Sequence, residues 1–327
     1  MKNPLHSMKL NISGITLYLY LRLRHRNSLI LLLLLSSPIT AINSAYANED
    51  KDKVKEDECT PLQNFFEKRV CTEKLLRHQP FVLIPYKPNY FIYSWSDNLN
   101  SQNPLLKNHE AKFQISFKVP INEHHDDTRW LWFLGYTQLS VWQMVNSDHS
   151  SPFRDTNFEP ELMLTRLSNA KFLGWNIRLI NFGLINHQSN GKSPPDSRSW
   201  NRSYVDFLIE RDSYYISLKK WYRWKEEQKT TPTDFVGDDN PDIEDYVGHG
   251  ELKFIHAGAL NNITLSLRDI NNSNRLASYQ LDWSYPVGSR RGLRFYLQYF
   301  NGYGETLIDY NIKRERFGMG IMLTDWL

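Results

Sequence analysis

Two stretches, SYQLDWSY at residues 278–285 and LRFYLQY at residues 293–299, decide the fold, because apolar and polar side chains alternate along both of them. Successive side chains of an extended strand point to opposite faces, so each stretch has one apolar and one polar face. Residues 112–119, KFQISFKV, repeat the pattern earlier in the chain. The alternation predicts an all-β fold. A soluble sandwich contains strands of the same kind, so a membrane barrel needs further support.

Several other features favour the membrane barrel. The chain holds 18 Tyr and 10 Trp, and such rings gather at the strand ends, where they meet the two membrane interfaces. The strands approach the roughly 9–11 residues that a tilted membrane strand needs. One apolar parity runs from Phe317 through Leu323 to the final Leu327, as expected of a strand that closes a barrel. We therefore predict one domain, a transmembrane antiparallel up-and-down β-barrel over residues 81–327.

The N-terminus predicts export. An apolar run at residues 29–35 follows Arg22, Arg24 and Arg26, and small residues at 45–47, AYA, form a cleavage site. The apolar run is too short for an anchor that spans about 30 Å of hydrocarbon. We therefore predict a signal peptide over residues 1–47. Its first part is long for such a signal, so Met8 is an alternative start.

Residues 48–80 are predicted to be a short periplasmic leader, because the chain is charged and lacks periodicity as far as about Lys74, after which we expect structure to begin. The leader holds both cysteines, Cys59 and Cys71. An exported chain meets an oxidising compartment, which favours a disulfide, but two independent thiols are an equal alternative. No metal-ligand pattern accompanies the pair, so zinc is not expected.

Composition excludes two classes of protein. The hydrophobic fraction is 41% and the mean hydropathy is −0.54, values that exclude a bundle of membrane helices. Lys and Arg number 39 against 36 Asp and Glu, so no large basic surface for nucleic acid is expected.

The stretch NHQSNGKSPPDSRSWNR at residues 186–202 carries the candidate chemistry. In an extended segment His187 and Ser189 emerge on the same face, which places a base beside a hydroxyl. A serine hydroxyl is a weak nucleophile until an imidazole accepts its proton, and a third group must hold that imidazole in one tautomer. Asn201 is the candidate for this third group. Gly191, with an accessible backbone N–H, is the candidate oxyanion donor.

The neighbours of these residues predict where the side chains point. On the parity of His187 the preceding residues are mostly apolar, and so are those that follow Asn201 on its parity. The first set is Trp175, Ile177, Leu179 and Ile185, and the second is Val205, Phe207 and Ile209. If the two segments are neighbouring strands, the polar trio lies on the outer wall next to lipid, where an amide costs less to desolvate than a carboxylate. The alternative is an ordinary polar hairpin loop, since a His-x-Ser pair occurs often by chance.

Four blocks together resemble the outer-membrane phospholipase A family. They are SSPFR with TNFEP at residues 150–160, NHQSNG with SRSWNR at 186–202, DDNPDI at 238–243 and GYGETLIDYN at 302–311. The resemblance extends from about Phe81 to the C-terminus. It implies a twelve-stranded barrel that cleaves acyl esters of phospholipids and lysophospholipids when it dimerises with calcium. It also implies that Ser189 is the nucleophile, His187 the base and Asn201 the orienting group.

The resemblance further implies one calcium ion per active site, at the dimer interface. Its ligands are expected to be the carbonyl of Lys192, the hydroxyl of Ser197 and the carbonyl of Ser150 of the partner subunit. Gln138 matches a polar residue that pairs across the family's dimer interface.

The chain departs from the family pattern at two positions of this site. Lys192 stands in place of Arg, which a carbonyl ligand tolerates. Pro194 stands in place of an acidic residue that holds calcium in the monomer, and Asp196 is a candidate substitute because calcium accepts irregular oxygen geometry. For the acidic stretch at residues 238–242 the sequence favours a solvated loop over a calcium site.

These observations predict a calcium-dependent phospholipase A, homodimeric when active, in the bacterial outer membrane. One alternative is a passive barrel, either a pore or a structural protein, whose triad has decayed. Intact Ser189, His187 and Asn201 favour the enzyme over this alternative. Another alternative is a soluble secreted β-sandwich lipase, which would lack the aromatic strand ends and the apolar closing strand.

Overall fold

The computed structural model describes residues 6–12, 15–21, 32–34, 59, 65–77, 82–99, 103–121, 130–258, 260–269, 278–288 and 292–324. The chain divides into two units, Met1–Val54 and Lys55–Leu327. The first unit contains a small antiparallel sheet of β1 (His6–Ile12), β2 (Ile15–Leu21) and β3 (Leu32–Leu34). The predicted cleavage site at residues 45–47 lies outside the described residues, as does the final Leu327.

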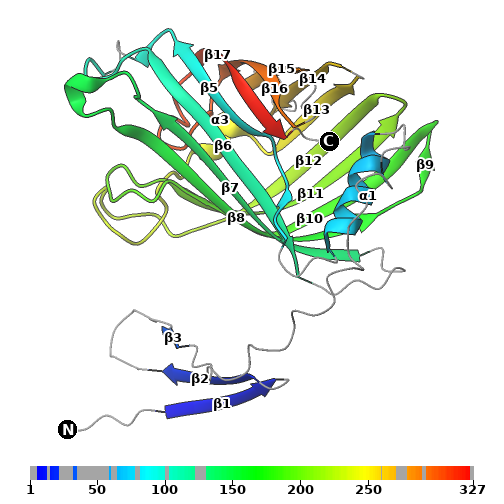
Figure 1. The fold of residues 1–327 in the computed structure, drawn as a ribbon. Helices are drawn as coiled ribbons and strands as arrows, with labels where there is room; N and C mark the ends of the chain where they lie inside the picture. Colours follow the sequence, from blue (N-terminus) through cyan, green and yellow to red (C-terminus); the bar gives the residue numbers. More distant parts are fainter. Residues whose placement is uncertain are drawn as a thin grey trace, which may run out of the picture. The chain divides into compact units, whose positions relative to one another are not determined.

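Twelve antiparallel strands close into a barrel in the second unit (Figure 1). They are β5 (Asn89–Ser96), β6 (His109–Pro120), β7 (Trp130–Trp142), β8 (Phe153–Leu167), β10 (Trp175–Ser189), β11 (Ser199–Arg211), β12 (Tyr214–Trp224), β13 (Gly250–Ala257), β14 (Asn262–Arg268), β15 (Ser278–Pro286), β16 (Arg294–Gly302) and β17 (Arg314–Thr324). The last strand pairs with the first, through partners such as Phe317 and Trp95, and this pairing completes the ring. The predicted fold class and strand number are confirmed.

Two short strands lie beside the ring. β4 (Ile84–Pro85) pairs with β6, and β9 (Lys171–Phe172) pairs with β10. The loops contain a 3-10 turn, η2 (Ser147–His149), and a short helix, α3 (Ile243–Val247). Among the described residues, no helix is both long and apolar enough to cross a bilayer.

The strands bury their polar face and expose their apolar face, which is the reverse of the pattern in a water-soluble protein. On β17 the apolar Phe317 and Leu323 are 42% and 58% exposed, whereas the inward Arg316 is 1% exposed. On β15 the polar Asp282 is buried and Leu281 is exposed. Because exposed apolar bands are stable next to lipid and not next to water, this pattern excludes the soluble sandwich.

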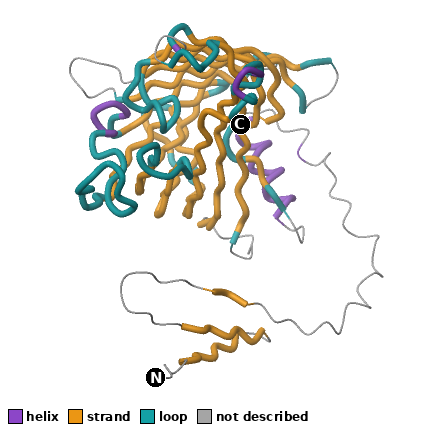
Figure 2. Tube along the Cα trace, turned by 90° about the vertical axis from the view of Figure 1, so that its left-hand side faces the viewer, coloured by secondary structure: helices purple, strands orange, loops and turns teal. Residues whose placement is uncertain are grey.

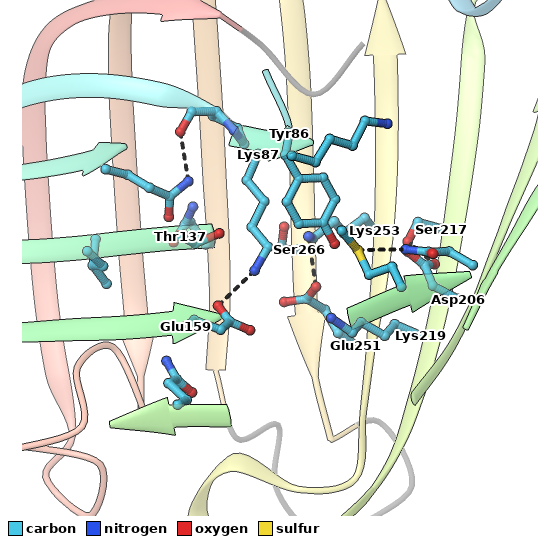
Figure 3. A pocket seen from close by; sticks show the side chains of 18 of the residues that line it. Tyr86, Lys87, Thr137, Glu159, Asp206, Ser217, Lys219, Glu251, Lys253 and Ser266 are labelled. Atoms are coloured by element: carbon cyan, nitrogen blue, oxygen red, sulfur yellow. Dashed lines mark hydrogen bonds and ion pairs between the residues drawn. The ribbon is translucent and has the colours of Figure 1, made fainter. Parts of the chain in front are cut away.

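Charged side chains fill the lumen and form ion pairs. Arg316 contacts Glu110 at 2.8 Å and Glu305 at 2.9 Å, and Glu305 also contacts Lys112 at 2.9 Å. A cavity of about 310 Å³ lies within the barrel, and Figure 3 shows ion pairs of its lining, among them Lys87 with Glu159 at 2.7 Å. These ion pairs make the interior polar and offset part of the cost of burying its charges.

The segment before the barrel is structured, which corrects the expectation that structure begins after Lys74. Helix α1 (Phe65–Arg77) lies beside β10–β12 in Figure 1 and is one of the helices coloured in Figure 2. The backbone N–H of Phe66 donates to the hydroxyl of Tyr215 at 3.4 Å, and Glu73 pairs with Lys118 at 2.9 Å. Residues of α1 also line the lumen cavity. The helix is therefore part of the barrel domain's packing.

A disulfide joins Cys59 to Cys71, with a Cα–Cα distance of 5.8 Å. Of the two alternatives that the sequence left open, the structure has the disulfide. Cys71 lies within α1, so the bond attaches the preceding chain to a helix that already packs against barrel residues.

Candidate active site

The residues of the predicted triad lie on two neighbouring strands. β10 and β11 pair in antiparallel register, with His187 opposite Asn201 and Ser189 opposite Ser199. His187 Nδ1 and Asn201 Oδ1 are 2.8 Å apart. The register brings together an imidazole and an amide that are 14 residues apart in the chain, because the loop at residues 190–198 returns the second strand alongside the first.

Their side chains are directed away from the lumen. The alternate residues Gln188, Trp200 and Arg202 line the lumen cavity, and Trp200 Nε1 donates to Gln188 Oε1 at 2.8 Å there. Side chains alternate between the faces of a strand, so His187 and Asn201 lie on the outer wall. The lumen cavity is consequently not the candidate catalytic site, although it is a well-formed hollow of the described barrel.

The outward facing that side-chain parity predicts for β10 holds near the site and fails further along the strand. The register shifts twice, between Ile177 and Leu179 and between Gly183 and Asn186. Between these bulges Leu179 and Asn181 line the lumen cavity, so Leu179 does not share the outer face of His187. A β-bulge inserts one extra residue and thereby reverses the facing of every residue beyond it, which single-sequence parity does not detect.

Gly191 follows the candidate nucleophile in a left-handed conformation, with φ of 65°. Its backbone N–H donates to Ser189 Oγ at 3.1 Å. A Cβ at this position would lie 3.3 Å from the ring of Phe158, so both the conformation and the space favour glycine. In the part of the chain that the structure describes, the hydroxyl of Ser189 has this bond and no direct bond to His187, a contact that often forms only when substrate is bound.

The buried Asn190 organises the loop between the two strands. Its Nδ2 donates to the carbonyl of Asp196 at 2.9 Å, and its Oδ1 accepts from the backbone N–H of Arg198 at 2.9 Å. Lys192 directs its ammonium to the carbonyl of Arg154 on β8, at 2.7 Å. The side chain of Lys192 thus points to a protein partner, as a carbonyl ligand for calcium would allow.

The acidic stretch at residues 238–242 is packed against this loop, which corrects the expectation of a solvated loop. Asp239 accepts from the hydroxyls of Ser197 at 2.7 Å and Ser199 at 3.1 Å and also pairs with Lys229. Partial burial opposes ionisation of Asp239, but the hydrogen bonds from Lys229 and Ser197 keep its pKa below the usual range. Asn240 is fully buried and accepts from the backbone N–H of Ser199 at 3.0 Å.

The expected calcium ligands fit the ion in their chemistry. Ser197 supplies a hydroxyl and its neighbour Asp239 a carboxylate, and calcium prefers such oxygen donors. Asp196, the candidate substitute ligand, is exposed, and the carboxylate in contact with Ser197 is that of Asp239. Ser150 ends η2 in a left-handed conformation. The described residues contain no cluster of three or more His, Cys, Asp or Glu suited to a metal. The expected calcium ligands are two backbone carbonyls and a hydroxyl, which such a cluster does not include.

Gln138 belongs to a line of polar side chains on β7 and β8. Tyr136 donates to Gln138 Oε1 at 3.1 Å, Gln138 Nε2 donates to Ser140 at 3.1 Å, and Ser140 shares a 3.2 Å hydrogen bond with Thr156. Gln138 has the same parity on β7 as the exposed Trp132 and Leu134, so it lies on the outer wall.

Glu226 also belongs to the site, although its sequence position did not predict it. Asn201 Nδ2 donates to Glu226 Oε1 at 2.9 Å, so a carboxylate lies behind the amide that contacts His187. Glu226 is two residues beyond the end of β12 and 25 residues from Asn201. The only sequence signal is indirect, because Trp224 is the register partner of Asn201 and a residue shortly after it must lie near the site.

The fold and the site define a membrane β-barrel with a hydroxyl, an imidazole and an amide on its outer wall. A family model described as Phospholipase A1 matches residues 66–323, and the chain belongs to this family. Relatives named phospholipase A1 from Escherichia coli K12 and from Klebsiella pneumoniae are both 38% identical, over 75% of this chain and over 83% and 84% of theirs.

Solved structures agree with this assignment. Outer membrane phospholipase A from Escherichia coli matches with a TM-score of 0.69 and 36% identity, over 76% of this chain and 95% of that one. The outer membrane phospholipase dimer of Salmonella typhi with bound calcium matches with a TM-score of 0.68 and 37% identity over the same shares.

Proposed function

We propose that this chain is a calcium-dependent phospholipase A of the outer membrane, with Ser189 as nucleophile, His187 as base and Asn201 as the group that orients the base. Its substrates are the acyl esters of phospholipids and lysophospholipids. The observation that carries the proposal is the 2.8 Å contact between His187 and Asn201 on the outer wall, with Ser189 two residues further along β10. Membership of the phospholipase A1 family supports the substrate class.

The proposed reaction has two proton transfers at His187. Its Nε2 takes the proton of Ser189 while Oγ attacks the ester carbonyl, and it then gives this proton to the departing glycerol oxygen. Water next attacks the acyl-serine, His187 takes a proton from this water, and the fatty acid leaves as the proton returns to Ser189. Asn201 accepts from the Nδ1–H throughout, which keeps Nε2 free to act as the base.

Negative charge develops on the ester oxygen in both steps, and the backbone N–H of Gly191 is the proposed donor to it. This N–H is already 3.1 Å from the attacking oxygen atom, so it lies close to the reacting centre. Calcium held by Lys192, Ser197 and Ser150 of the partner subunit would add positive potential at the same place.

Dimerisation is proposed to complete the site, because one of the expected calcium ligands comes from the second subunit. The polar side chain of Gln138 supports this interface, since an amide on a lipid-facing wall is stabilised when it pairs with another polar group. A Gln138→Leu variant should give less cross-linked dimer in the presence of calcium, with the monomer still folded.

Export by a signal peptide over residues 1–47 and insertion of residues 81–327 into the outer membrane complete the proposal. The aromatic and apolar outer wall supports the membrane location, because an exposed wall of this composition requires lipid around it.

The test is fatty-acid release by detergent-solubilised protein, with and without a calcium chelator. We expect release that the chelator removes. Ser189→Ala should abolish it, whereas Ser193→Ala in the adjacent exposed loop should retain it. All variants should keep the heat-modifiable gel mobility of a folded barrel. Hydrolysis by Ser189→Ala would refute the nucleophile, and no hydrolysis by the unaltered protein would favour a passive barrel.

A further inference from the structure

The orientation of the Asn201 amide decides whether His187 can act as a base. If Asn201 Oδ1 faces His187, it accepts from Nδ1–H and leaves Nε2 unprotonated. If the amide is turned over, its Nδ2 donates to Nδ1, and the proton of the neutral imidazole must then be on Nε2. The two orientations have almost the same shape, and only the second abolishes the base.

The productive orientation therefore needs a partner that binds the nitrogen of the Asn201 amide, and Glu226 lies beside this nitrogen. Asn201 Nδ2 donates to Glu226 Oε1 at 2.9 Å, while Asn201 Oδ1 is 2.8 Å from His187 Nδ1. An ionised carboxylate has only acceptors, so it bonds the nitrogen of the amide and is repelled by its oxygen. This one-sided preference selects the productive orientation.

The chain around Glu226 is held in place. Trp224, two residues earlier, pairs with Asn201 in the β11–β12 register and donates from its indole nitrogen to Ser203 at 3.0 Å. One residue later, the carbonyl of Glu227 accepts from the backbone N–H of Asp238 at 2.7 Å. Glu226 is half-buried, whereas Glu227 is exposed. The chain on both sides of Glu226 is thus anchored, which places its carboxylate beside Asn201.

We propose that Glu226 is a positioning residue that fixes the amide of Asn201 and, through it, the tautomer of His187. This inference rests on the proposed function, because it assigns Glu226 a part in the same reaction. The working array is then a chain of four groups, from Ser189 through His187 and Asn201 to Glu226. The last member is supplied by the loop after β12, and the three members on the outer wall are a hydroxyl, an imidazole and an amide.

The first test compares three variants of the full-length, detergent-solubilised protein. Glu226→Ala should lower kcat on the order of tenfold with KM unchanged, as expected for loss of one hydrogen bond to a charged group. Glu226→Gln can still turn an acceptor oxygen toward Asn201 and should recover most of the activity. Glu227→Ala is the matched control and should be unaffected. Equal losses in Glu226→Ala and Glu226→Gln would overturn the positioning role.

A double-mutant cycle distinguishes a positioning role of Glu226 from a merely structural one, because it compares the effect of Glu226→Ala on kcat in different Asn201 backgrounds. In an Asn201→Ala background Glu226 has no amide to orient, so Glu226→Ala should cause no further loss. In an Asn201→Asp background the two carboxylates repel each other, and Glu226→Ala should raise kcat. A further loss in either background would contradict the proposal.

The Ser189→Ala variant separates this inference from the proposed function. If Ser189→Ala retains hydrolysis, the proposed triad fails. If Ser189→Ala is inactive and Glu226→Ala is fully active, only the inference about Glu226 fails.

Discussion

Asn201 lies directly opposite His187 on the outer wall, and the next residues on the same two strands, Trp200 and Gln188, form a hydrogen bond on the lumen side. A single pair of strands therefore carries the candidate catalytic contact on one face and a structural contact on the other. Because both contacts depend on the same register, the packing of the lumen also fixes the distance between the imidazole and the amide.

Gly191→Ala is expected to impair the reaction. The left-handed backbone at this residue costs an alanine about 1–2 kcal/mol, and the added Cβ would meet the ring of Phe158 at 3.3 Å. The loop should shift to relieve both, which moves the proposed oxyanion donor, so we expect kcat to fall on the order of tenfold to hundredfold. Steady-state kinetics measure this. Gly292→Ala, where a Cβ meets nothing within 4 Å, is the control, and equal activities of the two variants would argue against the role of Gly191.

Arg316→Met is expected to destabilise the barrel. The guanidinium contacts Glu110 and Glu305, and its removal leaves two buried carboxylates with less positive charge around them. Breaking a buried pair typically costs about 3–5 kcal/mol, which urea unfolding in lipid vesicles would resolve. The exposed pair of Lys107 and Asp148 gives the contrast, because Lys107→Met should leave the unfolding midpoint unchanged. Similar midpoints for both variants would show that the lumen network contributes little.

The docking of α1 is expected to depend on pH through Glu73. Burial opposes its ionisation, but Lys118 and Arg69 outweigh this and lower its pKa from 4.5 to about 2. A carboxyl whose pKa is depressed in the folded state stabilises that state fully above its ordinary pKa and loses this effect as pH falls toward the folded value. The protection of α1 amides against hydrogen exchange, corrected for the intrinsic pH dependence of the exchange rate, should accordingly decrease as the pH falls from 4.5 to 2.

Glu73→Gln should show this reduced protection already at neutral pH. Glu67→Gln removes a more exposed carboxylate of the same helix and is the matched control. Unchanged exchange in Glu73→Gln would mean that the ion pair with Lys118 does not hold the helix.

The sequence predicts the barrel because its signal is repeated in several strands. Alternation needs only the residues of one strand, so stretches such as residues 278–285 and 293–299 give the correct faces directly. The sequence does not predict the bulges of β10, since an extra residue leaves no mark in an alternating pattern that contains Asn181 and Gly183. The same limit explains why Leu179 was placed on the wrong face.

The candidate site is only partly readable for a related reason. His187 and Ser189 are two residues apart, so their common face follows from local geometry. Asp239 and Glu226 reach the site from loops whose path depends on the whole barrel, and no spacing in the sequence joins them to Ser197 or Asn201. Helix α1 was missed although its apolar residues, such as Phe66, do face the barrel, because the charged residues between them obscure the helical period.

The most direct test of the account is to find which residue a serine-directed reagent modifies. Detergent-solubilised protein would be treated with a long-chain alkyl sulfonyl fluoride in the presence of calcium, digested and analysed by mass spectrometry. The account predicts a single adduct on Ser189 that His187→Ala prevents. An adduct on a different serine, or labelling of Ser189 that does not require His187, would contradict it.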